Sequence, residues 1–187
     1  MRKRDDEKQD SIKKSVIQLI LQEGFHGTSI SKIAKLAGVS PATVYIYYEN
    51  KEVMLRDIYQ EYAEDVFDYL LHHLVPDMSG EQLIDVLIRQ YYQYILENEE
   101  IFHFVDQFSS CPSLHEGCHA LQGPKSLNHI LLEYKERGIL NDFNNENIWS
   151  ILFYPVKSIA VNPRNSDASS EELLDEMISI IRKALLK

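Results

Sequence analysis

The sequence TSISKIAKLAGVSPATVYIYYENKE, residues 28–52, decides the fold of this chain. Apolar residues recur at helical spacing over about residues 29–37, and Gly38 then supplies a residue that readily takes the left-handed conformation at which helices end. Ser40 followed by Pro41 is an N-cap and a first helical position, so a second helix of about two turns starts there. Two short helices joined by a glycine turn predict a helix-turn-helix.

The second helix of this motif has one face that the protein core does not need. Ala34, Gly38 and Val44 are small or branched residues that suit a steep crossing of the two helices. The residues left for the free face are Pro41, Ala42, Thr43, Tyr45 and Tyr47. Because this helix has no Arg, Asn or Gln for bidentate base contacts, we expect hydroxyl groups, methyl groups and aromatic rings to meet the major groove of DNA.

The motif and its flanks resemble a known family. The residues that carry the resemblance are Gly24-Phe25, Gly27-Thr28-Ser29-Ile30, Ile33-Ala34, Ala37-Gly38-Val39-Ser40, Thr43-Val44-Tyr45, Tyr48 and Asn50-Lys51-Glu52. In order and spacing they are similar to the amino-terminal domain of TetR-family (tetracycline-repressor-like) transcriptional regulators, over about residues 11–56. There are two departures. Ser29 replaces a more frequent threonine, and Tyr48 replaces a usual phenylalanine, so its hydroxyl needs solvent, a polar partner or a phosphate.

The resemblance implies DNA contacts by four residues: Thr43, Tyr45, Tyr47 and Lys51. Side-chain chemistry and exposed helix-start amides extend the set, because such groups suit thymine methyls and phosphates. The full set of predicted DNA contacts is Ser29, Ser31, Pro41, Ala42, Thr43, Tyr45, Tyr47 and Lys51. The alternative, that the tyrosines are packing residues, stays open for Tyr45 and Tyr48 and to a lesser degree for Tyr47.

The charge of the chain is unevenly divided. The 187 residues carry a net charge of −10. Residues 1–56 hold 10 Lys and Arg against 7 Asp and Glu, a balance of +3, while residues 57–187 hold 9 against 22, a balance of −13. The basic side of this division coincides with the motif, although Arg2, Lys3 and Arg4 account for all of its excess and can equally be a solvated tail. We find no membrane-length apolar run and no signal peptide at the start, so we expect a cytoplasmic protein.

The remaining sequence predicts helices alone. Apolar periodicity and breaks predict helices over about 5–23, 50–73, 79–96, 98–108, 124–138, 145–161 and 170–185. The expected fold is all-α, with a three-helix DNA-binding domain in residues 1–50 and a larger helical domain for effector binding and dimerisation in residues 51–187. The resemblance implies that the last two helices pair with those of a second subunit, and a palindromic operator independently requires a two-fold protein.

Aromatic residues of the larger domain are candidates for a small-molecule pocket, as the resemblance implies. They are Tyr91, Tyr94, Phe104, Phe108, Trp149 and Phe153. Each of them is also explained as an ordinary core residue, because aromatic residues at helical spacing usually pack inside a domain. The sequence does not identify the effector.

A cluster of Cys111, His115, Cys118 and His119 is the most unusual feature outside the motif. Two thiolates and two imidazoles suit zinc, but the spacing matches no familiar zinc site, so we expect no metal and no redox-sensing pair. We also find no phosphate-binding loop or nucleophile elbow, and expect neither enzyme activity nor a cofactor. The sequence therefore predicts a dimeric repressor that a small-molecule effector releases from a palindromic operator. The alternative is a helical interaction module, or a metal- or redox-sensing module, without an effector pocket.

Overall fold

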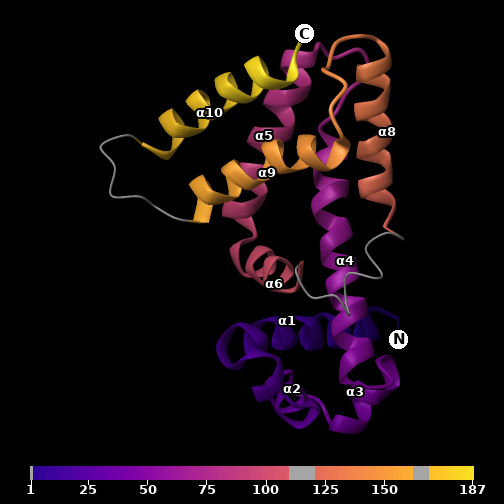
Figure 1. Cartoon of the computed structure of the whole chain (residues 1–187). Coiled ribbons are helices and arrows are strands. Elements are labelled where there is room, and N and C mark those ends of the chain that lie inside the picture. Colours follow the sequence, from indigo (N-terminus) through magenta and orange to yellow (C-terminus); the bar gives the residue numbers. More distant parts are fainter. Residues whose placement is uncertain (1, 110–120, 162–168) are drawn as a thin grey trace. The chain divides into compact units, whose positions relative to one another are not determined.

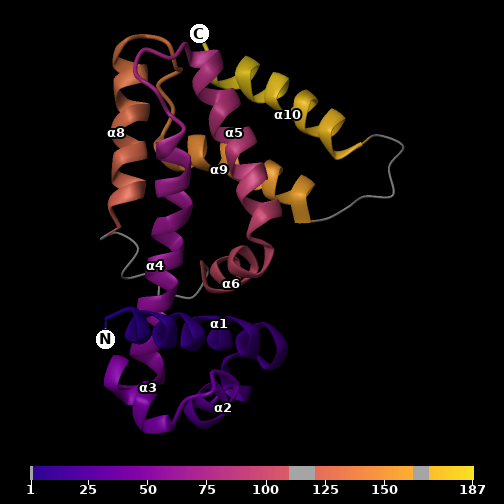
Figure 2. The same cartoon turned by 180° about the vertical axis from the view of Figure 1, so that it is seen from behind.

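A computed structural model describes residues 2–109, 121–161 and 169–187 of the chain. The described residues form helices joined by short turns (Figures 1 and 2). The helices are α1 (Arg2–Gly27), α2 (Ile30–Leu36), α3 (Pro41–Tyr47), α4 (Lys51–His72), α5 (Gly80–Glu97), α6 (Glu99–Ser109), α8 (Gln122–Glu136), α9 (Asn145–Val161) and α10 (Ser170–Leu185). A lone antiparallel bridge between Leu140 and Leu186 is the only β pairing in this part of the chain. The prediction of an all-α fold is confirmed.

The chain folds as two compact units. The first comprises residues 1–63 and 100–120, and the second comprises residues 64–99 and 121–187. Helix α4 contributes to both, because the division falls within it, between Ala63 and Glu64.

In the first unit, α1, α2, α3 and the start of α4 enclose an apolar core. Ile12, Val16 and Ile20 of α1 are fully buried, as are Met54 and Ile58 of α4. This is the stripe that helical spacing predicts for an amphipathic helix. The helical stretch of α1 bends at Gly24, whose φ of 71° is a conformation that glycine adopts without strain. The bend turns the chain toward α2.

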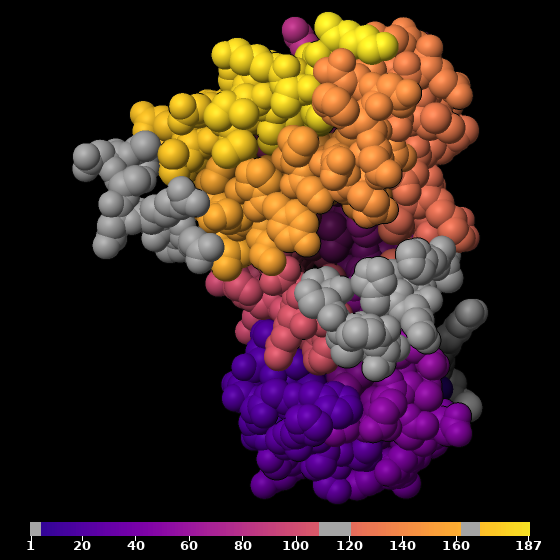
Figure 3. Space-filling model, in the orientation of Figure 1, coloured from indigo at the N-terminus to yellow at the C-terminus, as the bar shows by residue number. Residues whose placement is uncertain are grey.

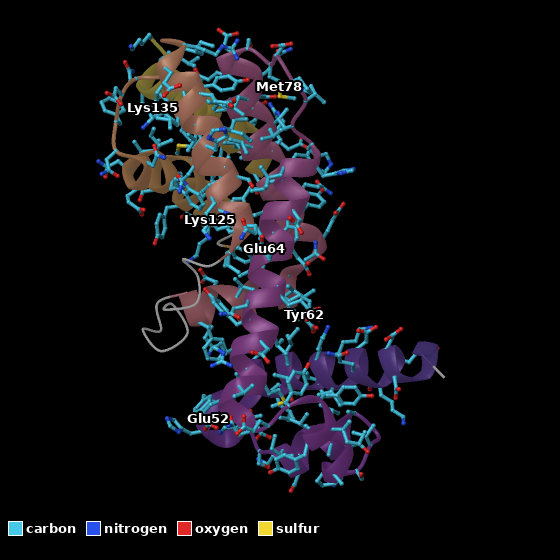
Figure 4. The ribbon with its side chains drawn as sticks, turned by 90° about the vertical axis from the view of Figure 1, so that its right-hand side faces the viewer. Glu52, Tyr62, Glu64, Met78, Lys125 and Lys135 are labelled. Carbon is cyan, nitrogen blue, oxygen red and sulfur yellow. The ribbon has the colours of Figure 1, made fainter. Side chains whose placement is uncertain are left out.

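In the second unit, α5, α9 and α10 pack on one another, and α8 runs beside the carboxyl-terminal half of α4 in both views (Figures 1 and 2). The core of this unit is a set of buried aliphatic side chains that includes Leu87, Ile148, Leu152, Val156 and Ile181. Helix α8 begins with no side-chain bond from its own N-cap residue. Instead Glu64 of α4, labelled in Figure 4, accepts a hydrogen bond of 2.6 Å from the Gly123 amide.

Caps fix the helix boundaries of the second unit. Ser79 and Gln82 form a capping box that starts α5, and Ser169 with Glu172 forms a second one that starts α10. Asn98 ends α5, because its backbone amide and its side-chain amide both donate to the Tyr94 carbonyl, at 2.9 and 3.1 Å, and α6 begins at the next residue.

Candidate nucleic-acid interface

The turn between α2 and α3 has the geometry that its sequence predicts. Ser29 accepts a hydrogen bond from the Lys32 amide at 3.3 Å and Ser40 accepts one from the Thr43 amide at 3.1 Å, so each hydroxyl caps its helix. Gly38 has a φ of 68°, which a residue with a side chain rarely adopts. Val44 is fully buried and locks α3 against α2. Helix α3 is therefore held from one side only.

The other side of α3 is open to solvent. Pro41, Ala42 and Tyr45 are exposed, as predicted for residues that face DNA, and the Tyr45 side chain is 55% exposed. Ile46 is 79% exposed, the highest value among the large apolar residues of the described chain. Sequence reasoning missed Ile46. Its position in the sequence could have indicated its exposure. Ile46 is two residues from both Val44 and Tyr48, and residues two apart in a helix point to opposite faces.

Thr43 and Tyr47 lie at the edge of this free face, and both hydroxyls already have partners in the chain. The Thr43 hydroxyl lies 2.9 Å from the Ser40 hydroxyl within the cap of α3. The Tyr47 hydroxyl donates to Asp5 in the first turn of α1, 3.2 Å from Oδ1 and 3.3 Å from the backbone oxygen. Local desolvation and the Asp5 carboxylate raise the pKa of Tyr47 above its usual value. Tyr47 therefore stays protonated at neutral pH.

Tyr48 belongs to the core. It is 4% exposed, and its hydroxyl lies close enough to Gln9 and Lys13 for both to affect its titration. Burial raises the pKa of Tyr48, although the Gln9 bond and the Lys13 charge oppose that rise.

Lys51, a predicted phosphate contact, ties the start of α4 to the turn before α2. Its ammonium donates to the Phe25 carbonyl at 3.0 Å and to the Thr28 carbonyl at 3.1 Å, and it lies 3.9 Å from the centre of the Phe25 ring. An ammonium carries three donor hydrogens, so these two bonds leave one for a phosphate oxygen. Lys51 thus has a structural task alongside any task at DNA.

The start of α2 offers exposed polar groups. Ser29 and Ser31 are both exposed, and the Ser29 hydroxyl is engaged in the cap. Lys32 in the same turn pairs with Glu23 and donates to the Gly27 carbonyl at 2.9 Å. Ser31 is therefore the more available of the two predicted serine contacts.

The six aromatic residues predicted for an effector pocket fall in both units. Phe104 and Phe108 belong to the first unit, where their rings lie 5.2 Å apart, and the other four belong to the second. There Phe153 lies 4.9 Å from Tyr91 and 5.8 Å from Trp149, measured between ring centres.

Trp149 and Tyr94, the other predicted pocket residues of the second unit, have further contacts. Trp149 also contacts Phe67, and its indole N–H donates to Asn128 at 2.9 Å. Tyr94 is buried and contacts Tyr69 instead. Tyr91, Trp149 and Phe153 thus form one aromatic cluster, together with Phe67.

A surface hollow of about 440 Å³ in the second unit lies elsewhere, between α5 and α10. Its lining is mostly charged: Asp85, Arg89, Asp175, Ile178, Ser179, Arg182 and Lys183. Arg89 bonds to both Asp85 and Asp175, and Arg182 bonds to Asp85, so the charges of the hollow are largely paired with one another.

Two further expectations concern metals and membranes. Cys111, His115, Cys118 and His119 lie outside the described residues. Among the residues that are described, no group of three or more His, Cys, Asp or Glu is arranged to hold a metal ion. In the same part of the chain, every helix is too short or too polar to span a bilayer.

Comparisons with known proteins agree with this geometry. Residues 16–58, from α1 through the helix-turn-helix into α4, match the family model of bacterial regulatory proteins of the tetR family. One curated relative is the negative transcriptional regulator IcaR of the biofilm operon icaADBC of Staphylococcus epidermidis, 29% identical over 104 residues, which are 55% of this chain and 54% of the relative. Another is the fatty acid metabolism regulator protein of Bacillus subtilis, 25% identical over 81 residues, or 43% of this chain and 42% of the relative. The chain therefore spans about half the length of the curated relatives it matches.

Solved structures share the fold of the whole chain. A TetR family transcription regulator from Marinobacter aquaeolei VT8 superposes with a TM-score of 0.84 at 23% identity and covers all of both chains. A TetR-family transcriptional regulator from Haemophilus influenzae Rd gives a TM-score of 0.84 at 18% identity and covers 96% of this chain and 97% of its own. The segment that matches the tetR family model contains the helix-turn-helix, and the whole chain has the fold of solved TetR-family regulators.

Proposed function

We propose that this protein is a dimeric transcriptional repressor whose residues 1–50 bind a palindromic operator and whose residues 51–187 bind an effector and form the dimer. The observation that carries the proposal is the free face of α3, where Tyr45 and Ile46 are exposed. The helix itself is held in place by its caps and by the buried Val44. An apolar face on a rigid, solvent-exposed helix suits the major groove, where thymine presents its methyl group.

The DNA-binding proposal is tested by selecting fragments from random DNA with the full chain. We expect one palindromic sequence to be enriched, with affinity that falls as salt is added, because binding releases counterions from phosphates. Thr43→Ala and Tyr47→Ala should abolish the preference while the helical circular-dichroism spectrum is kept. Leu132→Ala, which changes an exposed residue of α8, is the control. If no sequence is enriched, or if both variants select the wild-type sequence, the proposal is wrong.

We place the dimer interface on α9 and α10, which lie side by side on one face of the second unit in Figure 3. Ile178 and Ile181 of α10 are 3% and 1% exposed within the chain itself, so they serve its own core. Tyr154 of α9 is 68% exposed and Ile180 of α10 is 51% exposed, and these two are the better candidates for contact with a partner.

Charge at the exposed positions tests the interface. Ile180→Asp together with Tyr154→Asp should give monomers in light scattering without loss of helical content. Leu132→Asp, at an apolar residue of α8 with 46% exposure, should leave the dimer intact. Dimers that persist in the double variant, or a wild-type chain that is monomeric, would remove this assignment.

We infer that the effector binds at the aromatic cluster of Tyr91, Trp149, Phe153 and Phe67. The cluster combines apolar rings with a polar group, the Asn128 side chain that holds the Trp149 indole, and this mixture is typical of small-molecule sites. Phe67 lies on α4, which contributes to both units. An effector that favours one position of α4 would shift the two recognition helices away from the spacing of successive major grooves, about 34 Å.

The single tryptophan of the chain provides the assay, since Trp149 lies in the cluster. A compound that releases operator DNA should change Trp149 fluorescence, and Phe153→Ala should weaken that compound without changing DNA affinity in its absence. Release with unchanged fluorescence and an unchanged response in Phe153→Ala would place the effector elsewhere.

A further inference from the structure

The contact between Tyr47 and Asp5 determines whether the Tyr47 hydroxyl of α3 can donate a hydrogen bond to DNA or only accept one. A phenolic hydroxyl has one hydrogen to donate and lone pairs that accept. The Asp5 carboxylate and backbone oxygen only accept, so the Tyr47 hydroxyl is necessarily the donor to both, at 3.2 and 3.3 Å. Its one hydrogen is committed to α1. What the hydroxyl can offer DNA is an acceptor.

Base edges and phosphates differ in what they present to such an acceptor. Phosphate oxygens, guanine N7 and O6, adenine N7 and thymine O4 all accept, and none of them can donate to the Tyr47 oxygen. In the major groove only the amino groups of adenine and cytosine donate. Asp5 adds a second acceptor beside the hydroxyl, and Asp5 and Asp6 both act on Tyr47 with negative charge, which disfavours a phosphate at this point.

We propose that Asp5 is a positioning residue for DNA specificity: it holds the Tyr47 hydroxyl as an acceptor, so that Tyr47 reads the amino group of an adenine or cytosine rather than a phosphate. The inference rests on the proposed DNA-binding function of α3. It assigns a role to the amino-terminal turn of α1, which the helix-turn-helix pattern alone does not include. It also gives a base-specific polar contact to a helix that lacks Arg, Asn and Gln.

The test uses the full chain and the operator that it selects from random DNA. Each adenine of the operator is replaced in turn by purine, and each cytosine by 2-pyrimidinone, which deletes only the amino group. We expect one position per half-site at which the deletion weakens wild-type binding by about tenfold, the usual scale for one base contact. Tyr47→Phe should bind both versions equally at that position, because it has lost the acceptor.

Variants of Asp5 then show whether this residue positions the Tyr47 hydroxyl or only repels DNA through its charge. Asp5→Ala should reduce the amino-group preference at the same position, and in the Tyr47→Phe background it should change that preference no further. Asp6→Ala is the matched control, since Asp6 acts on Tyr47 through its charge alone. It should alter the affinity for all sequences equally and keep the preference.

The outcomes are distinct. An amino-group preference that depends on both Tyr47 and Asp5 supports the inference. If Asp5→Ala raises affinity uniformly, as Asp6→Ala does, and leaves the preference unchanged, Asp5 is only a repelling charge and the inference is overturned while DNA binding stands. If the wild-type chain enriches no sequence at all, the proposed function and this inference both fall.

Discussion

Replacing Lys51 by methionine separates the contribution of this residue to the stability of the fold from its contribution to DNA affinity. Methionine keeps an unbranched side chain beside the Phe25 ring but removes the ammonium that donates to the Phe25 and Thr28 carbonyls at 3.0 and 3.1 Å. Hydrogen bonds to charged groups contribute about 1.5–3 kcal/mol each when sheltered, and a cation near a ring about 0.5–1 kcal/mol. Because Lys51 is half-buried, and ordering its side chain costs up to about 2 kcal/mol, we expect Lys51→Met to lower the free energy of unfolding by about 2 kcal/mol.

Urea denaturation followed by circular dichroism checks this value, with Lys35→Met, at an exposed lysine of α2, as the control for loss of one charge. The same two variants are titrated with operator at several salt concentrations. If the third N–H of Lys51 binds a phosphate, the slope of log K against log salt should become shallower by about 0.9 in Lys51→Met. A variant with unchanged stability and only a changed slope would refute the structural role that the two carbonyl bonds indicate.

Three further predictions concern single side chains of the two units. Burial raises the pKa of Tyr48 above 10.0, so the folded state keeps a proton that the unfolded state loses; stability should fall as the pH rises through 10, and Tyr48→Phe should flatten that fall in urea titrations at high pH. Gly123→Ala should cost about 1–3 kcal/mol in urea denaturation, because the new Cβ would lie 2.2 Å from the Phe67 Cβ, and Phe67→Ala should recover part of the loss. Glu64→Ala should lower the melting temperature, because α8 loses its cap at about 1 kcal/mol, whereas Glu64→Gln keeps an acceptor for the Gly123 amide and should melt close to wild type.

Local rules written in the sequence predicted the first unit well. Ser29, Ser40 and Gly38 are caps and a turn whose chemistry acts over three or four residues, and the structure shows each of them in its expected role. The capping box of Ser79 and Gln82 is equally local, and the helix start predicted at about residue 79 agrees with it.

The sequence could not predict contacts between residues that are far apart in the chain. Nothing in the motif indicates that Tyr47 bonds to a residue 42 positions earlier, or that Lys51 bonds to carbonyls 23 and 26 positions away. The division of the aromatic residues between the two units is also long-range information. Helical spacing shows that Phe104 and Tyr91 are apolar-face residues, but it does not show that they belong to different units.

These long-range partners bear on the roles of the proposed DNA-contact residues. On the proposed DNA-binding face, the exposed side chains of Tyr45 and Ile46 would contribute mainly apolar contact. Tyr47 and Lys51 are already bonded, and their remaining hydrogen-bonding capacity, an acceptor on one and a single donor on the other, points in directions that the protein has fixed. A side chain that is fixed before binding loses less conformational entropy on binding. The internal bonds of these two residues are therefore compatible with DNA contact and make each contact more selective for its partner.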